Sequence, residues 1–222
     1  MGPVDQTMPA LFEARAGTDA GTFLPLAQLG AGPDGTVVLA RRGERLLELH
    51  QLTFGPGTPR WAALEARVRA IAAVDHPAVR PVLAVEPEPP ALVLEGDSFP
   101  PLAELIEQPS IDLGRILRVL TELARALAAA HHLGVFHGGI HPWSVWVGNG
   151  DRPRIELTAL ATRATHEPWV ARCLPPEAGQ GPGDGPADVH ALGALLELFA
   201  AGRDASALVR AIARDALAPD PE

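Results

Sequence analysis

Apolar residues recur with two different periods along this chain. Between Phe23 and about Leu94 they lie in short alternating runs separated by turn residues, a pattern typical of strands. After Pro100 they recur every three or four residues, which is typical of helices with one buried face. This order predicts an α+β fold in which a small β-rich lobe is followed by a helical lobe.

The same patterns give expected boundaries. In the first part we expect a helix at 61–74 and strands at 36–40, 45–52, 80–85 and 91–95. In the second part we expect a strand at 155–157, a flexible loop at 179–186, and helices at 102–106, 112–132, 188–201 and 205–217. The predicted organisation is a flexible N-terminal arm at 1–21, an N-lobe at 22–98 and a C-lobe at 99–222.

Composition narrows the classes of function. The formal net charge of −9, with 18 scattered basic residues, argues against a nucleic-acid partner, since phosphate backbones are bound through basic patches. The single cysteine, Cys173, excludes an internal disulfide and suits a reducing compartment. No apolar run reaches the roughly 18 residues of a membrane span, and the start lacks a signal-peptide pattern. We therefore expect a cytoplasmic protein without direct membrane insertion.

Five short motifs stand out against this background. They are Gly30-Ala-Gly32-Pro-Asp-Gly35-Thr-Val37, His76-Pro77, His137-Gly-Gly-Ile-His141-Pro-Trp-Ser144-Val-Trp-Val147, Pro175-Pro-Glu177 and Asp188-Val-His-Ala-Leu-Gly193. In this order they resemble landmarks of the protein kinases, most closely the Ser/Thr kinases of high-GC bacteria. The resemblance implies a bilobal protein-kinase-like fold whose C-lobe is truncated, without the family's helix αG and C-terminal end. The first motif alone is weak, because Pro33-Asp34-Gly35 is also an ordinary turn between strands.

The resemblance also implies which positions would carry phosphoryl transfer, and residues unsuited to that reaction stand there. The degenerate positions are His50 (phosphate-anchoring lysine), Arg67 (the glutamate that holds the lysine), Gly139 (catalytic aspartate), His141 (catalytic-loop lysine), Ser144 (metal-binding asparagine) and Ala159 (metal-binding aspartate). Every basic residue is an arginine, so no shift of register restores the lysine. A general base alone contributes roughly 10²–10⁴-fold. Losing base, metal ligands and anchor together predicts no useful phosphoryl transfer.

Nucleotide binding is a separate question. The positions that the resemblance assigns to it are Gly30, Gly32, Gly35, Val37, Glu48 and Leu94. Pro33 removes a backbone N–H from the loop tip, and Asp34 adds a negative charge where phosphates would lie. Because side chains alternate along a strand, Glu48 and His50 should both face the cleft, where a carboxylate packs badly against a purine. The alternative is that Glu48 reaches solvent. We expect no cofactor, and the sequence disfavours ATP binding.

Other positions are expected to serve packing. The structural residues implied by the resemblance are Ile71, Val82, His137, Leu160, Asp188 and Glu177. The first four would form a packed column above Asp188, which would accept backbone N–H groups from the catalytic-loop region. Glu177 would lack its usual arginine partner, because the chain ends before it. The simultaneous exchange at two cleft positions suggests a charge-reversed ion pair between Arg67 and Glu48.

Four histidines lie in or near the catalytic-like loop, residues 137–147, and suggest a metal hypothesis. They are His131, His132, His137 and His141. No cysteine or paired carboxylate joins them at ligand spacing, so the sequence predicts no metal site. Asp151 and Glu156 are the acidic residues nearest to that loop, and neither is expected to be placed for a metal.

Three functions remain open from the sequence. The preferred one is a catalytically inactive pseudokinase that serves as a regulatory scaffold and binds a protein partner of unknown identity. The alternatives are a nucleotide-binding sensor without turnover and a divergent non-kinase transferase on the same fold. Because tryptophan is enriched at interfaces, we expect either Trp143 or Trp169 to be exposed.

Overall fold

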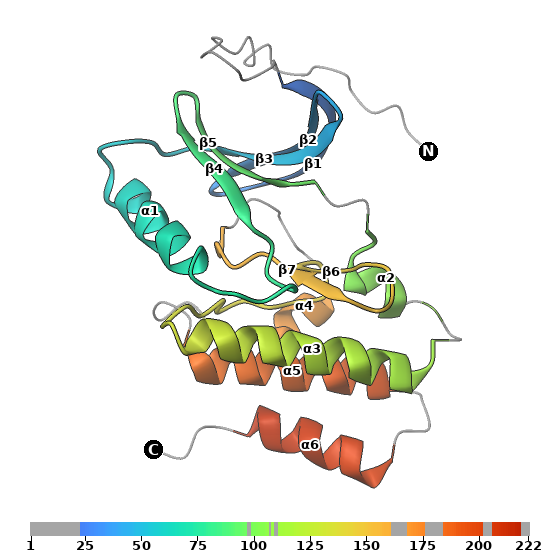
Figure 1. Ribbon diagram of the computed structural model, residues 1–222. Helices are drawn as coiled ribbons and strands as arrows, with labels where there is room; N and C mark the ends of the chain where they lie inside the picture. Colours follow the sequence, from blue (N-terminus) through green and yellow to red (C-terminus); the bar gives the residue numbers. More distant parts are fainter. Residues whose placement is uncertain are drawn as a thin grey trace.

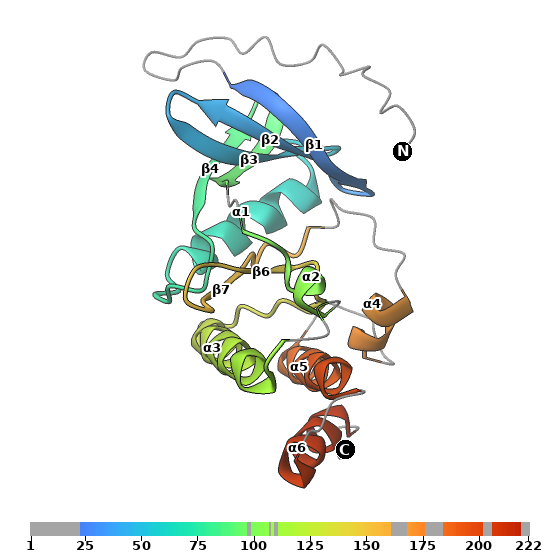
Figure 2. The same ribbon diagram turned by 90° about the vertical axis from the view of Figure 1, so that its right-hand side faces the viewer.

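The computed structural model describes residues 23–96, 99–106, 108, 111–160, 168–175, 184–201 and 206–218. Figure 1 shows a sheet with one helix at its side, placed above a set of helices, and Figure 2 shows the same two layers from the side. A short two-stranded sheet lies between the layers. The predicted α+β fold with a β-rich part followed by a helical part is confirmed.

The upper layer is a five-stranded antiparallel sheet. Its strands are β1 (Leu24–Gly32), β2 (Gly35–Arg42), β3 (Arg45–Leu52), β4 (Val82–Pro87) and β5 (Pro90–Glu95), in the order β1-β2-β3-β5-β4. Helix α1 (Pro59–Ile71) lies between β3 and β4 in sequence, and Thr58 caps it by accepting the N–H of Trp61. Strand β3 is central, so its backbone is paired on both sides and its side chains are fixed in direction.

The two faces of β3 differ in chemistry. Leu47 and Leu49 pack with Ala40 and Val93 in a small apolar cluster. Glu48 and His50 lie on the opposite face, and their cross-strand partners on that face include Val37 and Leu94. The alternation predicted from the sequence is therefore confirmed, and it turns two ionisable side chains toward the lower layer.

The lower layer is helical. It contains α2 (Leu102–Ile106), α3 (Leu113–His131), α4 (Pro168–Cys173), α5 (Gly185–Ala200) and α6 (Ala207–Leu217), with the hairpin of β6 (Val145–Val147) and β7 (Pro153–Ile155) above them. The largest core cluster joins α3, α5 and this hairpin. Helix α5 packs against both α3 and α6, which explains why its sequence is apolar on all sides.

Several predicted boundaries shift. The strand expected at 80–85 begins at Val82, and the strand expected at 155–157 ends at Ile155. The helix expected from residue 61 begins at Pro59, because Thr58 is its cap, and it ends at Ile71. Helix α5 already begins at Gly185, inside the expected loop at 179–186. The predicted arm at 1–21 and Glu177 lie outside the described residues, as do residues 202–205, where αG was expected to be missing.

No helix within the described ranges is long and apolar enough to span a bilayer.

Candidate functional site

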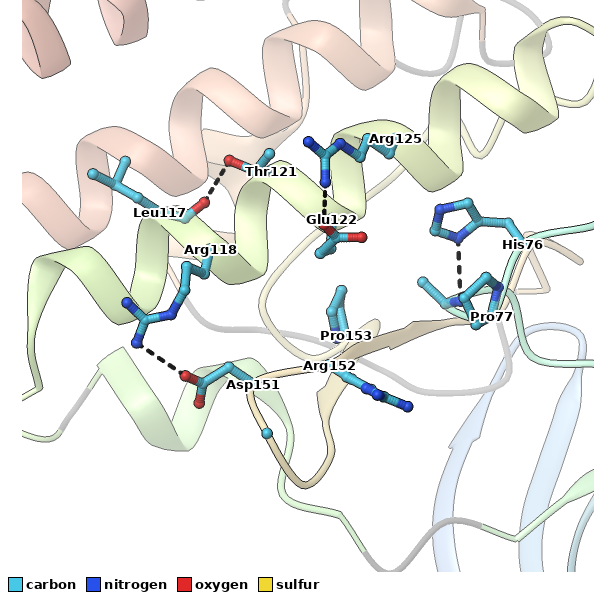
Figure 3. A pocket seen from close by; sticks show the side chains of 12 residues that line it. His76, Pro77, Leu117, Arg118, Thr121, Glu122, Arg125, Asp151, Arg152 and Pro153 are labelled. Carbon is cyan, nitrogen blue, oxygen red and sulfur yellow. Dashed lines mark hydrogen bonds and ion pairs between the residues drawn. The ribbon is translucent and has the colours of Figure 1, made fainter.

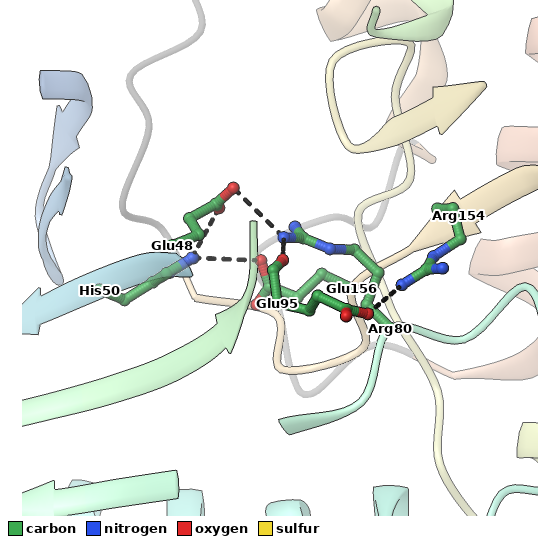
Figure 4. Close-up of polar contacts among 6 residues, drawn as sticks. All are labelled: Glu48, His50, Arg80, Glu95, Arg154 and Glu156. Atoms are coloured by element: carbon green, nitrogen blue, oxygen red, sulfur yellow. Dashed lines mark hydrogen bonds and ion pairs between the residues drawn. The ribbon is translucent and has the colours of Figure 1, made fainter. Parts of the chain in front are cut away.

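Buried charges gather where β3 faces the lower layer. The Nε2 atom of His50 lies 2.9 Å from Oε1 of Glu48 and 3.7 Å from Oε2 of Glu156, which follows directly after β7. Figure 4 shows these side chains converging from the two layers. His50 and Glu48 are only 1% and 3% exposed, and Glu156 is 13% exposed. Glu48 therefore does not reach solvent, and the alternative that placed it there is wrong.

Arg80 is the centre of this group. Its side chain is fully buried, with a relative exposure of 0%. Nη2 donates to the backbone carbonyl of Glu95 at 2.6 Å and lies 3.3 Å from Oε2 of Glu48. The guanidinium also lies over the ring of Trp146, 4.7 Å from the centroid. A guanidinium stacked on an aromatic face and bonded to a carbonyl is held on two sides, so Arg80 is fixed against the face of β3 that carries Glu48.

Backbone pairing explains why Arg80 is held there. Val79 forms an isolated parallel bridge with Ile155, and the N–H of Arg80 donates to the carbonyl of Ile155 at 2.8 Å. The segment before β4 thus pairs with β7 before it joins the upper sheet. This pairing directs Arg80 inward between the two layers.

A second buried anchor fixes the catalytic-like loop. Asp188, at the start of α5, accepts the N–H of His137 at 2.9 Å and the N–H of Gly138 at 2.7 Å. It also lies 2.8 Å from Nε2 of His131. These contacts confirm the predicted role of Asp188. Burial lowers the pKa of His137 to about 4 although Asp188 opposes the shift, so this ring is neutral at pH 7.

The loop that follows bonds to itself. Ser144 Oγ donates to the carbonyl of His141 and accepts its N–H, at 2.8 and 3.0 Å. The N–H of Trp143 donates to Nδ1 of His141 at 3.2 Å. At Gly139 a Cβ would meet no atom within 4 Å. The loop therefore holds its shape through His141 and Ser144, while the position of the expected catalytic aspartate carries no side chain.

Ala159 stands at the expected metal-binding position in an unusual conformation. Its φ is 55°, in the left-handed region that residues with a Cβ rarely adopt. The methyl group offers no ligand atom, so this position cannot bind a metal through its side chain.

Arg67 does not pair with Glu48, and that hypothesis is wrong. Its Nε donates to the carbonyl of Leu157 at 2.6 Å, and its Nη2 donates to the carbonyl of Phe136. Burial lowers the pKa of Arg67, while Asp188 and Glu156 nearby raise it. Arg67 instead links helix α1 to two segments of the lower layer.

The glycine-containing motif forms a tight hairpin between β1 and β2. Gly32 pairs with Gly35, so Pro33 and Asp34 are the turn, as in the simpler of the two interpretations. Asp34 forms an ion pair with Arg60 at the start of α1, and its carbonyl accepts the N–H of Thr53. The carboxylate is thus neutralised by a partner in the same layer. Gly35 has φ of 145°, and a Cβ there would lie 1.8 Å from the carbonyl oxygen of Gln51.

Ile71 and Leu160, two of the residues expected to form one packing column, lie in different apolar clusters. Ile71 belongs to the large lower core, whereas Leu160 packs on a separate cluster formed with Leu52, Trp61 and Leu64. Val82 and His137 are half-buried. A single continuous column stays a prediction.

The remaining expected positions give a mixed result. Trp143 is half-buried, and the side chain of Trp169 lies outside the described part. Asp151 pairs with Arg115 and Arg118 on α3, away from the cleft, as expected. Glu156 is placed among possible ligands, so the expectation that it is badly placed is wrong.

Cys173 is buried in the core, and burial raises its pKa to about 12, which excludes it as a nucleophile at neutral pH.

Sequence reasoning missed Arg80 and Trp146 as partners. A signal for Arg80 was present, because a charged residue interrupts an otherwise apolar run from Ala78 to Val85. Such a residue in a strand-like run is either on a solvent face or paired inside. The run alone does not distinguish these cases.

A separate pocket of about 720 Å³ lies between α3, the turn that joins β6 to β7, and the connection from α1 to β4. Figure 3 shows its charged side chains in ion pairs, Arg118 with Asp151 and Arg125 with Glu122. Arg152 also lines it and is exposed. The pocket thus has three arginines against two acidic residues, an excess of positive charge in a chain of net charge −9.

Two curated proteins are similar to this chain. The DNA damage-responsive serine/threonine-protein kinase RqkA of Deinococcus radiodurans is 31% identical over an alignment of 208 residues, and the alignment covers 82% of this chain and 30% of that protein. The serine/threonine-protein kinase Pkn1 of Myxococcus xanthus is 26% identical over an alignment of 210 residues, and the alignment covers 84% of this chain and 30% of that protein. The chain thus has distant similarity to bacterial serine/threonine-protein kinases. It spans about 30% of the length of both relatives. No protein-family model matches the chain.

Proposed function

We propose that this chain is a catalytically inactive kinase-like module that binds a protein partner and leaves ATP unbound. The observation that carries the proposal is the side chain of Arg80, which is fully buried against the ring of Trp146 and the carboxylate of Glu48 on β3. A purine in a protein site is held by stacking and by hydrogen bonds to backbone groups. The guanidinium of Arg80 makes both kinds of contact itself, through Trp146 and the carbonyl of Glu95. Entry of a purine would require this group to leave.

Displacing Arg80 would be costly. Its departure leaves the buried carboxylate of Glu48 with less compensation, and breaking a buried ion pair on one side costs about 3–5 kcal/mol. The stacking contact adds about 1–2 kcal/mol when it is desolvated. A nucleotide that binds with millimolar affinity gains only about 4 kcal/mol. These magnitudes favour the closed arrangement over the bound one.

The residues at the expected catalytic positions also support a lack of phosphoryl transfer. His50 is engaged with two carboxylates, and Ser144 and His141 bond to each other. Neither Gly139 nor Ala159 offers a carboxylate. The groups that would accept the substrate proton and hold a nucleotide-bound metal are therefore replaced by groups that stabilise the loop or provide no ligand.

The test is a thermal-shift titration of the full chain with ATP, with and without Mg²⁺ or Mn²⁺. We expect no saturable shift, whereas binding at 100 times Kd would stabilise by about 2.7 kcal/mol. A metal-free shift would indicate a nucleotide sensor, and a metal-dependent shift with turnover would indicate an enzyme; either result would refute the proposal. The double variant Arg80→Met/Glu48→Ala removes both charges of the buried Arg80–Glu48 ion pair. ATP binding by this variant alone would show that the pair closes the cleft.

The partner surface that we propose is the arginine-containing pocket between α3 and the β6–β7 turn. Its excess positive charge suits an acidic segment of a partner protein. The measurement is capture of proteins encoded beside this chain's gene, with Arg152→Glu as the test variant and Arg45→Glu, an exposed arginine on β3, as the matched control. We expect capture to be lost only with Arg152→Glu. Equal capture by both variants would place the partner elsewhere.

A further inference from the structure

Three possible metal ligands converge where β3 faces the lower layer. Nε2 of His50, Oε1 of Glu48 and Oε2 of Glu156 all lie within 4.8 Å of one another. The contacts from Nε2 to the two oxygens are 2.9 and 3.7 Å. In a tetrahedral site with bonds of about 2.0–2.2 Å, ligand atoms are about 3.4 Å apart. Side-chain adjustments of less than about 1 Å would therefore bring these atoms into coordination geometry.

The surroundings are those of a built site rather than a surface group. His50 and Glu48 are almost fully buried, and Glu156 is the most exposed of the three at 13%. The second oxygen of Glu156, Oε1, is buried without a hydrogen-bond partner among the described residues. A buried carboxylate oxygen without a donor is unfavourable, and a metal ion bound by both oxygens of Glu156 would satisfy it.

Arg80, which is not one of the three ligands, orients the carboxylate of Glu48. Oε2 of Glu48 faces Nη2 of Arg80 at 3.3 Å, which leaves Oε1 turned toward His50. Ligating carboxylates in protein metal sites are commonly fixed by such a second contact. Glu48 and His50 come from the central strand β3, and Glu156 follows β7, so an ion here would join the upper sheet to the lower layer.

We propose that Glu48, His50 and Glu156 bind one divalent transition-metal ion, for which Zn²⁺ is the reference. An imidazole nitrogen with two carboxylates suits Zn²⁺, whereas Mg²⁺ prefers oxygen ligands alone and retains several waters. Two carboxylates also match the charge of a divalent ion. The site differs from the metal positions that the kinase resemblance implies, Ser144 and Ala159, and needs no nucleotide. It shares Glu48 with the ion pair used in the proposed function, and it would be a structural link between the lobes.

The experiment uses the full chain after treatment with a chelator, titrated with ZnCl₂ by calorimetry. We expect one equivalent of Zn²⁺ to bind and to raise the melting temperature. Glu156→Gln and His50→Gln should each weaken binding at least tenfold, because each removes one of three ligands. The matched control is His132→Gln, an exposed histidine at the end of α3, which should bind as the unchanged chain does.

A second readout separates the site from loose surface binding. Co²⁺ in place of Zn²⁺ should give the visible absorption of a tetrahedral ion, and this absorption should disappear in Glu156→Gln. If His50→Gln fails to fold, Glu156→Gln still decides, because its position is partly exposed and its shape is kept. Absence of a saturable equivalent, or equal binding by the unchanged chain and Glu156→Gln, would overturn the proposal.

Discussion

Replacing Asp188 by asparagine removes one acceptor from a fully buried site without changing its size. In the structure Oδ1 accepts the N–H of Gly138, and Oδ2 accepts the N–H of His137 and contacts His131. An asparagine keeps one oxygen and presents N–H donors in place of the other. Whichever way the amide is oriented, one backbone N–H of the loop faces a donor.

The expected cost follows from these contacts. A buried N–H that loses its acceptor costs about 1–3 kcal/mol, and the surviving bond loses the extra strength of a charged acceptor, about 1 kcal/mol. We therefore expect Asp188→Asn to lower the free energy of unfolding by about 3 kcal/mol. For a chain of this size that corresponds to a fall in melting temperature of about 6–12 °C. Urea unfolding followed by circular dichroism should show a lower midpoint with an unchanged slope.

The matched control is Asp112→Asn. Asp112 also accepts two backbone N–H groups, of Gly114 and Arg115, but as the exposed N-cap of α3. Asparagine is as good an N-cap as aspartate, so this variant should change stability by less than about 0.5 kcal/mol. If Asp188→Asn is no more destabilising than Asp112→Asn, Asp188 does not hold the loop as described.

Three further predictions concern single side chains. Arg67→Met should lower the free energy of unfolding by about 3 kcal/mol, because two carbonyls of the lower layer lose a charged donor. The control Arg69→Met, on the exposed side of α1, should change it by less than about 0.5 kcal/mol. Equal effects of the two variants in denaturation would contradict the contacts of Arg67. His137 has a folded pKa of about 4 against 6.5 unfolded, so the unfolded state binds its proton more readily. Stability should therefore fall as pH drops from about 6.5 toward 4, by up to about 1.4 kcal/mol per pH unit, and His137→Gln should reduce that slope; an unchanged slope would exclude this origin. Gly35→Ala should lower the free energy of unfolding by about 4 kcal/mol or more, because the new Cβ would meet a carbonyl oxygen on β3. The control Gly43→Ala, at a position with φ of 59° and open space, should lower it by only about 1 kcal/mol. Similar melting temperatures of the two variants would contradict the tight hairpin.

Elements set by local pattern were predictable from the sequence. Strand β3 has the predicted bounds, because alternation and the preceding turn at Gly43 both mark it. Helix α3 falls within one residue of its expected ends, and Asp112 before it is a good N-cap. The faces of β3 followed from the period of two residues. These features depend on neighbours in sequence, which a single chain displays directly.

The partners of the buried charges were not predictable in the same way. Arg67 was expected to meet Glu48, yet it donates to carbonyls 69 and 90 residues away. Backbone carbonyls compete with carboxylates for an arginine, and every residue supplies one, so charge complementarity alone does not choose the partner. Arg80 is directed inward by the pairing of Val79 with Ile155, which the strand pattern does not encode.

The contact of Arg67 with the lower layer has a consequence for binding thermodynamics. Helix α1 is tied to two segments of the other layer by one side chain, and these contacts restrain the relative orientation of the upper and lower layers. A partner that meets both layers would then find its surface already arranged. Association would require little loss of conformational entropy from this chain, which favours affinity for a given contact area.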